Sequence, residues 1–110
     1  MGHSLGALEE IILLLILREK ESYGAELVKL YTNQMKKQIT LPAVVMVLKR
    51  LEKKGLLNSE FGEATAMRGG KRKRFYRVTP YGKKALDEVM ETRRKLWDAV
   101  PPVAFEFKVS

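Results

Sequence analysis

The side chains of this sequence that suit chemistry are mostly cationic, and they are clustered. Between Ala64 and Leu86 there is no acidic residue. The same stretch carries eight bases: Arg68, Lys71, Arg72, Lys73, Arg74, Arg77, Lys83 and Lys84. Its centre, RGGKRKRFYR from Arg68 to Arg77, has the composition of a flexible basic loop that runs into an aromatic strand. The chemistry that this pattern favours is the binding of a polyanion.

A second cationic cluster lies upstream, where Lys49, Arg50, Lys53 and Lys54 edge a predicted helix. The chain has 21 bases and 13 acids in 110 residues, with a net charge of +8. Residues 36–54 sum to +5 and residues 64–86 to +8, whereas the rest is slightly acidic. Such a concentration is typical of a nucleic-acid footprint, and also of a patch for anionic lipid. A cationic helix followed by a cationic hairpin favours a winged-helix protein that grips a duplex.

Composition argues against several other classes of protein. The chain has no cysteine and one histidine, His3, so we expect no disulfide, no Cys/His metal site and no cofactor. The apolar run from Ile11 to Leu17 is too short to cross a bilayer, and it lacks the features of a signal peptide, so we expect a cytoplasmic protein that does not enter membranes. Glu9 and Glu10 are adjacent on a predicted helix and point in different directions, which makes them a poor acid/base pair. We therefore expect no enzyme activity.

Three helices are predicted before the hairpin. Residues 5–19 are apolar on nearly every side, which indicates either a helix that meets a second subunit or a central helix within one core. A second helix is predicted from a Ser22 cap to about residue 32. A third, about residues 41–54, has Thr40 as its cap, Pro42 in its first turn and Gly55 at its end. Its predicted buried stripe is Leu41, Val44, Leu48 and Leu51.

A hairpin and a long helix complete the prediction. Residues 56–61 and 73–78 are predicted strands around a loop at 62–71, with Tyr76 and Val78 facing inward. Thr79 and Pro80 begin a helix that runs to about residue 99. The fold expected is mainly α with a small β-wing (α+β), a winged helix-turn-helix plus a long C-terminal dimerisation helix. Its parts are a DNA-binding domain at 1–79, the dimerisation helix at 80–100, and a tail at 101–110 that could form an edge strand.

In helix-turn-helix geometry the second helix of the pair lies in the major groove, here residues 41–54. The cations of this helix can bind DNA phosphates, and Arg50 could also contact a guanine edge. Its apolar residues can contact thymine methyls. On the wing, Arg72 and Arg74 would enter a minor groove. The predicted DNA-binding set is Lys36, Lys37, Thr40, Pro42, Ala43, Met46, Lys49, Arg50, Lys53, Gly69, Gly70, Lys71, Arg72, Lys73 and Arg74. The plainer alternative is a solvated basic face.

The long last helix would have little of its own core left to cover, so we expect it to pair with a second copy. The predicted dimer or effector residues are Leu8, Ile12, Leu15, Leu86, Val89, Met90, Arg93 and Trp97. Trp97, the single tryptophan, could stack a flat aromatic effector across the two subunits. Ordinary packing between helices is the alternative for Trp97.

These residues resemble the PadR-like transcriptional regulators in their short form with one C-terminal helix. The similar segments are LGALEE from Leu5, YGAEL from Tyr23, the segment from Leu48 to Leu57, and GGKRKRFYRVT from Gly69 to Thr79 followed by Gly82, Ala85 and Leu86. The resemblance covers about residues 5–98, and Trp97 falls where the family often has a tryptophan.

The resemblance implies a homodimeric winged-helix repressor that binds a pseudo-palindromic operator in double-stranded DNA and responds to a small lipophilic or phenolic compound. Two positions depart from the family pattern, which commonly has Gly and Tyr where this chain has Pro42 and Val45. A tyrosine hydroxyl that could hold a phosphate is thus absent. Two other functions remain open, a winged-helix module that docks an acidic protein and a lipophilic-ligand carrier whose basic loop touches membranes.

Overall fold

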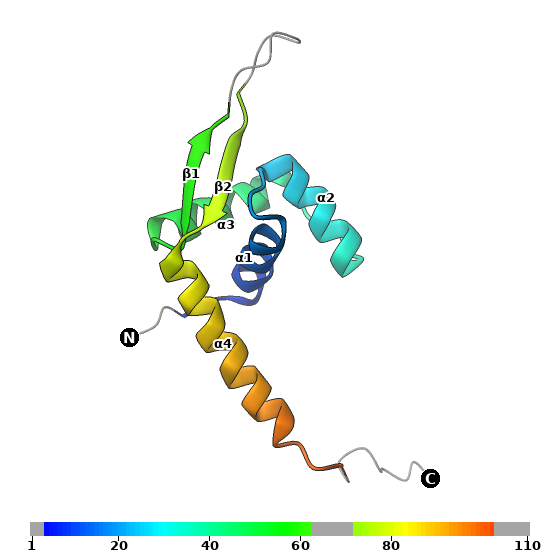
Figure 1. Ribbon diagram of the computed structural model, residues 1–110. Helices are drawn as coiled ribbons and strands as arrows, with labels where there is room; N and C mark the ends of the chain where they lie inside the picture. Colours follow the sequence, from blue (N-terminus) through cyan, green and yellow to red (C-terminus); the bar gives the residue numbers. More distant parts are fainter. Residues whose placement is uncertain (1–3, 63–71, 103–110) are drawn as a thin grey trace.

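The computed structural model describes residues 4–62 and 72–102. In chain order the elements are α1 (Ala7–Glu19), α2 (Gly24–Met35), α3 (Leu41–Lys53), β1 (Leu57–Phe61), β2 (Arg74–Val78) and α4 (Pro80–Asp98). The helices α1 and α3 pack against the base of an antiparallel hairpin, α2 packs on α1 and α3, and α4 runs away from the hairpin tip with α1 alongside its first part (Figure 1). The predicted mainly α fold with a β-wing is confirmed.

Local sequence explains where α3 and α4 begin. Thr40 caps α3 by accepting a 3.3 Å hydrogen bond from the Ala43 N–H, and Thr79 caps α4 by accepting a 2.9 Å bond from the Gly82 N–H. A proline follows each cap in the first turn, where its missing N–H removes no helical bond. Gly55 ends α3 with φ of +79°, a backbone angle that glycine adopts without strain. These predictions are confirmed.

The core forms around α1, which packs against α2, α3, β2 and α4. The buried core combines residues of all four helices and of the hairpin. These are Ile12, Leu13, Leu15, Ile16, Leu27, Val44, Val47, Leu48, Leu51, Leu56, Leu57, Tyr76, Ala85 and Leu86. The apolar surface of α1 is therefore largely covered by its own chain, as expected for a central helix within one core. The predicted α3 stripe was wrong at Leu41, which is 45% exposed, and it missed Val47.

Ser22 does not cap α2, which is a second correction. The N-cap residue is Tyr23, and α2 continues to Met35, three residues beyond the predicted end. The Ser22 backbone instead exchanges two hydrogen bonds with Tyr76 of β2, at 3.1 and 2.8 Å. Ser22 is fully buried, and its hydroxyl donates to the Glu26 carboxylate. The turn between α1 and α2 thus adds an isolated bridge to the hairpin and fixes the helix pair against the wing.

The hairpin register places Leu57 opposite Val78, Ser59 opposite Tyr76, and Phe61 opposite Arg74. Opposite residues share a face of an antiparallel pair, so these six side chains lie on one face. Tyr76 is buried and Val78 packs on the core, which confirms the predicted inward pair. Burial raises the pKa of the Tyr76 phenol. The residues at 62–71 and the tail fall mostly outside the described ranges, so the loop glycines and the predicted edge strand are not described.

Candidate nucleic-acid interface

The exposed side of α3 forms one stripe with two chemically different halves. Pro42, Met46, Lys49 and Lys53 follow one another at helical spacing and all are exposed. The first half of the stripe is apolar and the second half is cationic. Among the described residues, no acidic group pairs with Lys49 or Lys53. The helix therefore presents two cations to a polyanion at one end and apolar surface at the other.

Arg50 and Lys54 lie beside this stripe and are tied to α1. The Lys54 Nζ lies 3.0 Å from Glu9 Oε2, and the Arg50 Nε lies 3.5 Å from the same oxygen. Burial of the Glu9 carboxyl raises its pKa, but hydrogen bonds from the Gly6 N–H and Lys54, with the charges of Lys54 and Arg50, lower it overall from the ordinary 4.5. The Arg50 side chain is still 53% exposed, so it can also reach an external anion.

Two arginines lie against one aromatic ring at the outer end of the strands, next to residues 62–71, which is here called the wing base. The Arg74 Cζ is 4.8 Å and the Arg72 Cζ 5.7 Å from the centre of the Phe61 ring. The Arg74 Nε donates to the Ser59 hydroxyl at 2.8 Å, and that hydroxyl donates to the Glu52 carboxylate of α3 at 2.6 Å. This chain of contacts joins the wing to α3. It holds the two guanidinium groups on an exposed surface without enclosing them.

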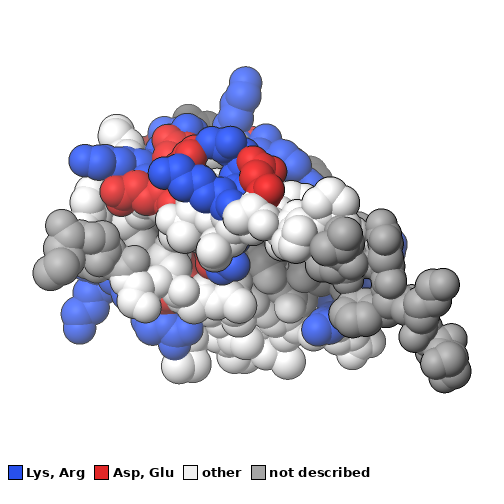
Figure 2. Space-filling model, turned by 90° about the horizontal axis from the view of Figure 1, so that it is seen from below, with Lys and Arg blue, Asp and Glu red and all other residues white. Residues whose placement is uncertain are grey.

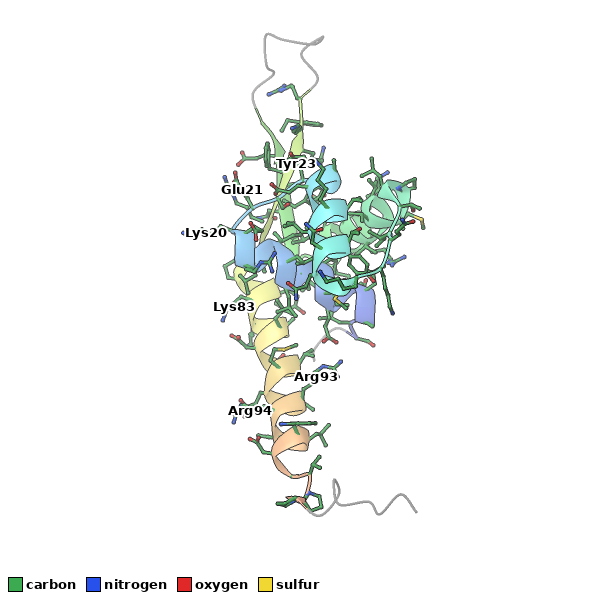
Figure 3. The ribbon with its side chains drawn as sticks, turned by 90° about the vertical axis from the view of Figure 1, so that its right-hand side faces the viewer. Lys20, Glu21, Tyr23, Lys83, Arg93 and Arg94 are labelled. Atoms are coloured by element: carbon green, nitrogen blue, oxygen red, sulfur yellow. The ribbon has the colours of Figure 1, made fainter. Side chains whose placement is uncertain are left out.

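Lys73 lies on the other face of the hairpin. Its Nζ is 4.3 Å from the centre of the Tyr23 ring, and Tyr23 makes an edge contact with Phe75 at 5.4 Å. Figure 3 shows Tyr23 beside the strands, at the start of α2. Cations of the wing base therefore occupy both faces of the hairpin, each beside an aromatic ring.

Other bases of the sequence cluster are paired with acids. Arg77 contacts Glu21 at 2.8 Å and Glu60 at 3.2 Å, and the hydrogen bond and charge from Glu21 raise its pKa. Lys83 pairs with Asp87 at 2.8 Å. Sequence spacing gave no sign that Glu21 lies beside Arg77, because the two meet only through the turn that bridges Ser22 to β2. Arg77 and Lys83 are therefore poorer anion ligands than the wing-base cations.

Of the remaining predicted DNA contacts, two lie in the turn before α3, one lies on α3, and three lie outside the described residues. Lys36 and Lys37 are exposed, and Lys36 ends α2 in the left-handed conformation with φ of 57°. Gly69, Gly70 and Lys71 fall in the part of the wing that the structure does not describe. Ala43 is half-buried on α3, beside the exposed stripe.

A two-pronged ion pair connects α1 to α4. The Arg93 Nε donates to Glu10 Oε1 at 3.1 Å and its Nη2 to Oε2 at 2.7 Å, which raises the Arg93 pKa. Figure 3 labels Arg93 on the side of α4 that faces the helical body and Arg94 on the other side. Arg93, predicted in the dimer or effector set, is thus paired within its own chain and ties α4 to α1.

The predicted dimer or effector set divides by burial. Ile12, Leu15 and Leu86 belong to the core of the chain itself, so their side chains are not available to a partner. Leu8, Val89 and Met90 are half-buried. Trp97 and its neighbour Leu96 are each 67% exposed. The use of this set as a dimer or effector interface stays a prediction, and among its apolar members Trp97 is the exposed one.

The outer half of α4 projects toward the side of the molecule that Figure 2 shows. From this side, charged side chains gather along one border and a broad uncharged surface lies next to them (Figure 2).

Within the described ranges no helix is long and apolar enough to cross a membrane. The same ranges hold no group of three or more His, Cys, Asp or Glu side chains that could bind a metal ion.

A family model and several solved structures point to the same family. A family model described as the transcriptional regulator PadR-like family matches residues 12–88. The structure of a PadR family transcriptional regulator from Eggerthella lenta DSM 2243 is 30% identical, with a TM-score of 0.69 over 84% of this chain and 77% of that chain. A PadR-like transcription factor from Bacteroides fragilis is 24% identical, with a TM-score of 0.72 over 83% of this chain and 84% of that chain. No protein of curated function matches significantly.

Proposed function

Because this chain belongs to the PadR-like family of transcriptional regulators, which bind DNA, we propose that it acts as a homodimeric repressor of a pseudo-palindromic duplex site. In this proposal α3 lies in the major groove and the wing contacts the adjacent backbone or minor groove. The single observation that carries it is the pair of exposed α3 cations, Lys49 and Lys53, beside a wing base that holds Arg72, Lys73 and Arg74. Glu52 and Ser59 join the two groups, so both would approach one duplex together.

The salt dependence of DNA binding tests the wing. We expect Arg72→Ala combined with Arg74→Ala to weaken binding to a selected duplex and to flatten the plot of log affinity against log salt. If each arginine meets one phosphate in each half of a dimer, the slope falls by about 3 to 4, because each phosphate contact contributes roughly 0.9.

The matched control removes the same charge elsewhere. Lys83→Ala with Lys84→Ala lowers the net charge equally but on α4, where Lys83 already pairs with Asp87. We expect its slope to stay close to that of the parent. Equal flattening by both variants would reduce the wing to a general charge effect. Tighter binding to anionic vesicles than to any duplex would favour the membrane-contact alternative, and binding without preference among duplexes would favour a docking module.

The dimer rests on α4. On α4 the exposed side chains of Leu96 and Trp97 lie C-terminal to the Arg93–Glu10 ion pair, outside the core of one chain. Two copies paired there would hold their α3 helices about one DNA turn apart, as half-sites require. We expect Leu96→Asp to leave the fold intact, to give monomers in analytical ultracentrifugation, and to lose affinity for the two-half-site duplex. A dimer of unchanged stability would refute the assigned interface.

The effector belongs to the same interface. A flat aromatic or lipophilic molecule between the subunits would contact Trp97, and its binding would release DNA by changing the angle between the subunits. Trp97 is the single tryptophan, so its fluorescence reports this site directly. We expect acridine, added without DNA, to quench that fluorescence in the parent and much less in the Leu96→Asp monomer. Equal quenching in both would place the dye outside the interface.

A further inference from the structure

The exposed face of α3 carries an apolar surface where a recognition helix meets base edges. Met46 is 60% exposed and Leu41 45% exposed, although both are large and apolar. The side chains from Leu41 to Leu48 contain no nitrogen or oxygen atom that could donate or accept a hydrogen bond. Lys49, the first cation of the exposed stripe, comes three residues after Met46, about one helical turn further along α3.

The backbone at this helix end offers few donors either. Pro42 has no N–H, and the Ala43 N–H is already bonded to the Thr40 hydroxyl at 3.3 Å. The Thr40 hydroxyl oxygen accepts this bond as the cap, which leaves its O–H as the polar side-chain donor next to the first turn of α3. Hydrogen-bonded recognition of a base by the first two turns of α3 is therefore poorly supported by the groups that the structure places there.

The charge next to the apolar surface indicates which partner covers it. Met46 and Pro42 share a stripe with Lys49 and Lys53, and the cationic wing base is joined to the same helix. An apolar protein surface would bury these cations without counter-ions, whereas a DNA groove supplies phosphates beside bases. The one apolar group on a base edge in the major groove is the C5 methyl of thymine.

Resting on the proposed function, we infer that Met46 is a specificity-determining residue that selects thymine by apolar contact with its C5 methyl. Pro42 and Leu41 extend the same surface. The thioether side chain of methionine is unbranched and polarizable, so it can adapt its shape to a methyl group in the groove. The operator is then distinguished by methyl contact and by duplex shape at positions where most recognition helices use hydrogen bonds.

Replacing thymine by uracil tests this inference, because it removes the methyl group and leaves every hydrogen-bonding atom in place. Duplexes that the protein binds tightly are first selected from a random library, and each thymine is then replaced singly with deoxyuridine. At a position in contact with Met46 we expect the affinity to fall about fourfold for each methyl removed. This factor corresponds to about 0.8 kcal/mol for each buried methyl or methylene group. Fluorescence anisotropy measures the affinity.

Two variants of similar size separate the effect of Met46 from general effects of the uracil. Met46→Leu keeps an apolar side chain and should keep the fourfold sensitivity. Met46→Gln should lose it, and should change the selected sequence because its amide can pair with adenine. Met46 is exposed, so neither variant should alter the unfolding midpoint.

The outcomes separate the inference from the proposed function. A selected duplex with no uracil-sensitive position, or equal sensitivity in the parent and Met46→Gln, overturns the role of Met46 while DNA binding stands. Failure of the library to yield any enriched sequence overturns the proposed function, and the inference with it.

Discussion

Replacing Gly82 with alanine should destabilise the fold, although alanine is the better helix former. Gly82 lies in the first turn of α4 and is buried against the backbone that links α3 to β1. A Cβ built on Gly82 would lie 2.3 Å from the Leu56 carbonyl oxygen and 2.9 Å from Val78 Cγ1. Real Cβ atoms essentially never approach another heavy atom closer than 3.0 Å, so something must move.

The Leu56 carbonyl cannot move without cost, because it accepts a 3.1 Å hydrogen bond from the Thr79 N–H. Overpacking of this kind costs about 1 to 3 kcal/mol, and loss of that hydrogen bond adds roughly 1 kcal/mol. The intrinsic preference of a helix for alanine over glycine returns about 1 kcal/mol. The sum of these terms predicts that Gly82→Ala lowers the free energy of unfolding by about 2 kcal/mol. Urea denaturation at one fixed protein concentration would measure this loss.

Gly24 gives a matched control, since it also lies in the first turn of a helix, α2. A Cβ there would meet the Leu41 Cδ1 at 3.1 Å, the end of a half-exposed side chain that can turn away. We expect Gly24→Ala to be neutral or to raise the free energy of unfolding by up to about 1 kcal/mol. Equal shifts of the two variants in the same direction, or a Gly82→Ala protein as stable as the parent, would refute the close-approach argument.

Three further changes test other contacts. Glu9→Gln should lower the unfolding midpoint at neutral pH and flatten its dependence below the ordinary pKa of 4.5: the folded pKa of Glu9 is lowered, so its contribution is complete above that value and is lost as pH falls through the folded pKa. Thr40→Ala should cost about 1 kcal/mol in urea denaturation through loss of the α3 cap, whereas Thr40→Ser should retain most of it. Glu10→Gln should loosen Arg93 and broaden the tolerance of DNA binding for altered half-site spacing, and an unchanged preference across duplexes with inserted base pairs would show that this ion pair does not set the spacing.

Features that depend on a few neighbouring residues were predictable from the sequence. Thr40 and Thr79 were identified as caps because a hydroxyl before a proline-led helix satisfies an exposed N–H whatever the tertiary fold. Gly55 was identified because few other residues adopt its backbone angle. Tyr76 and Val78 follow from the two-residue alternation of a strand.

The wrong predictions involve competition between local and distant partners. Ser22 has the residue type of a cap, but its backbone pairs with Tyr76, more than fifty residues away in the sequence. Leu41 fits the period of the α3 stripe, yet the first turn of that helix extends beyond the core, and Val47 takes the buried place. Arg77 is one of the eight bases of the cationic stretch, and nothing near it in the sequence shows that Glu21 lies beside it.

The two adjacent carboxylates of α1 connect the parts of the candidate interface. Glu9 pairs with Arg50 of α3 and with Lys54, the residue that caps the end of α3, while Glu10 pairs with Arg93 of α4, and both carboxylates are buried. Burying a charged group costs free energy unless the group is paired, so each carboxylate favours a helix position that keeps its cation within reach. Since neighbouring residues on a helix point in different directions, the two contacts tie α1 to α3 and to α4 separately, and together with the core packing they would help to set the angle between these helices. That angle would in turn set the distance between the two α3 helices of a dimer, so a molecule bound near Trp97 could act on DNA affinity by displacing α4 without touching α3.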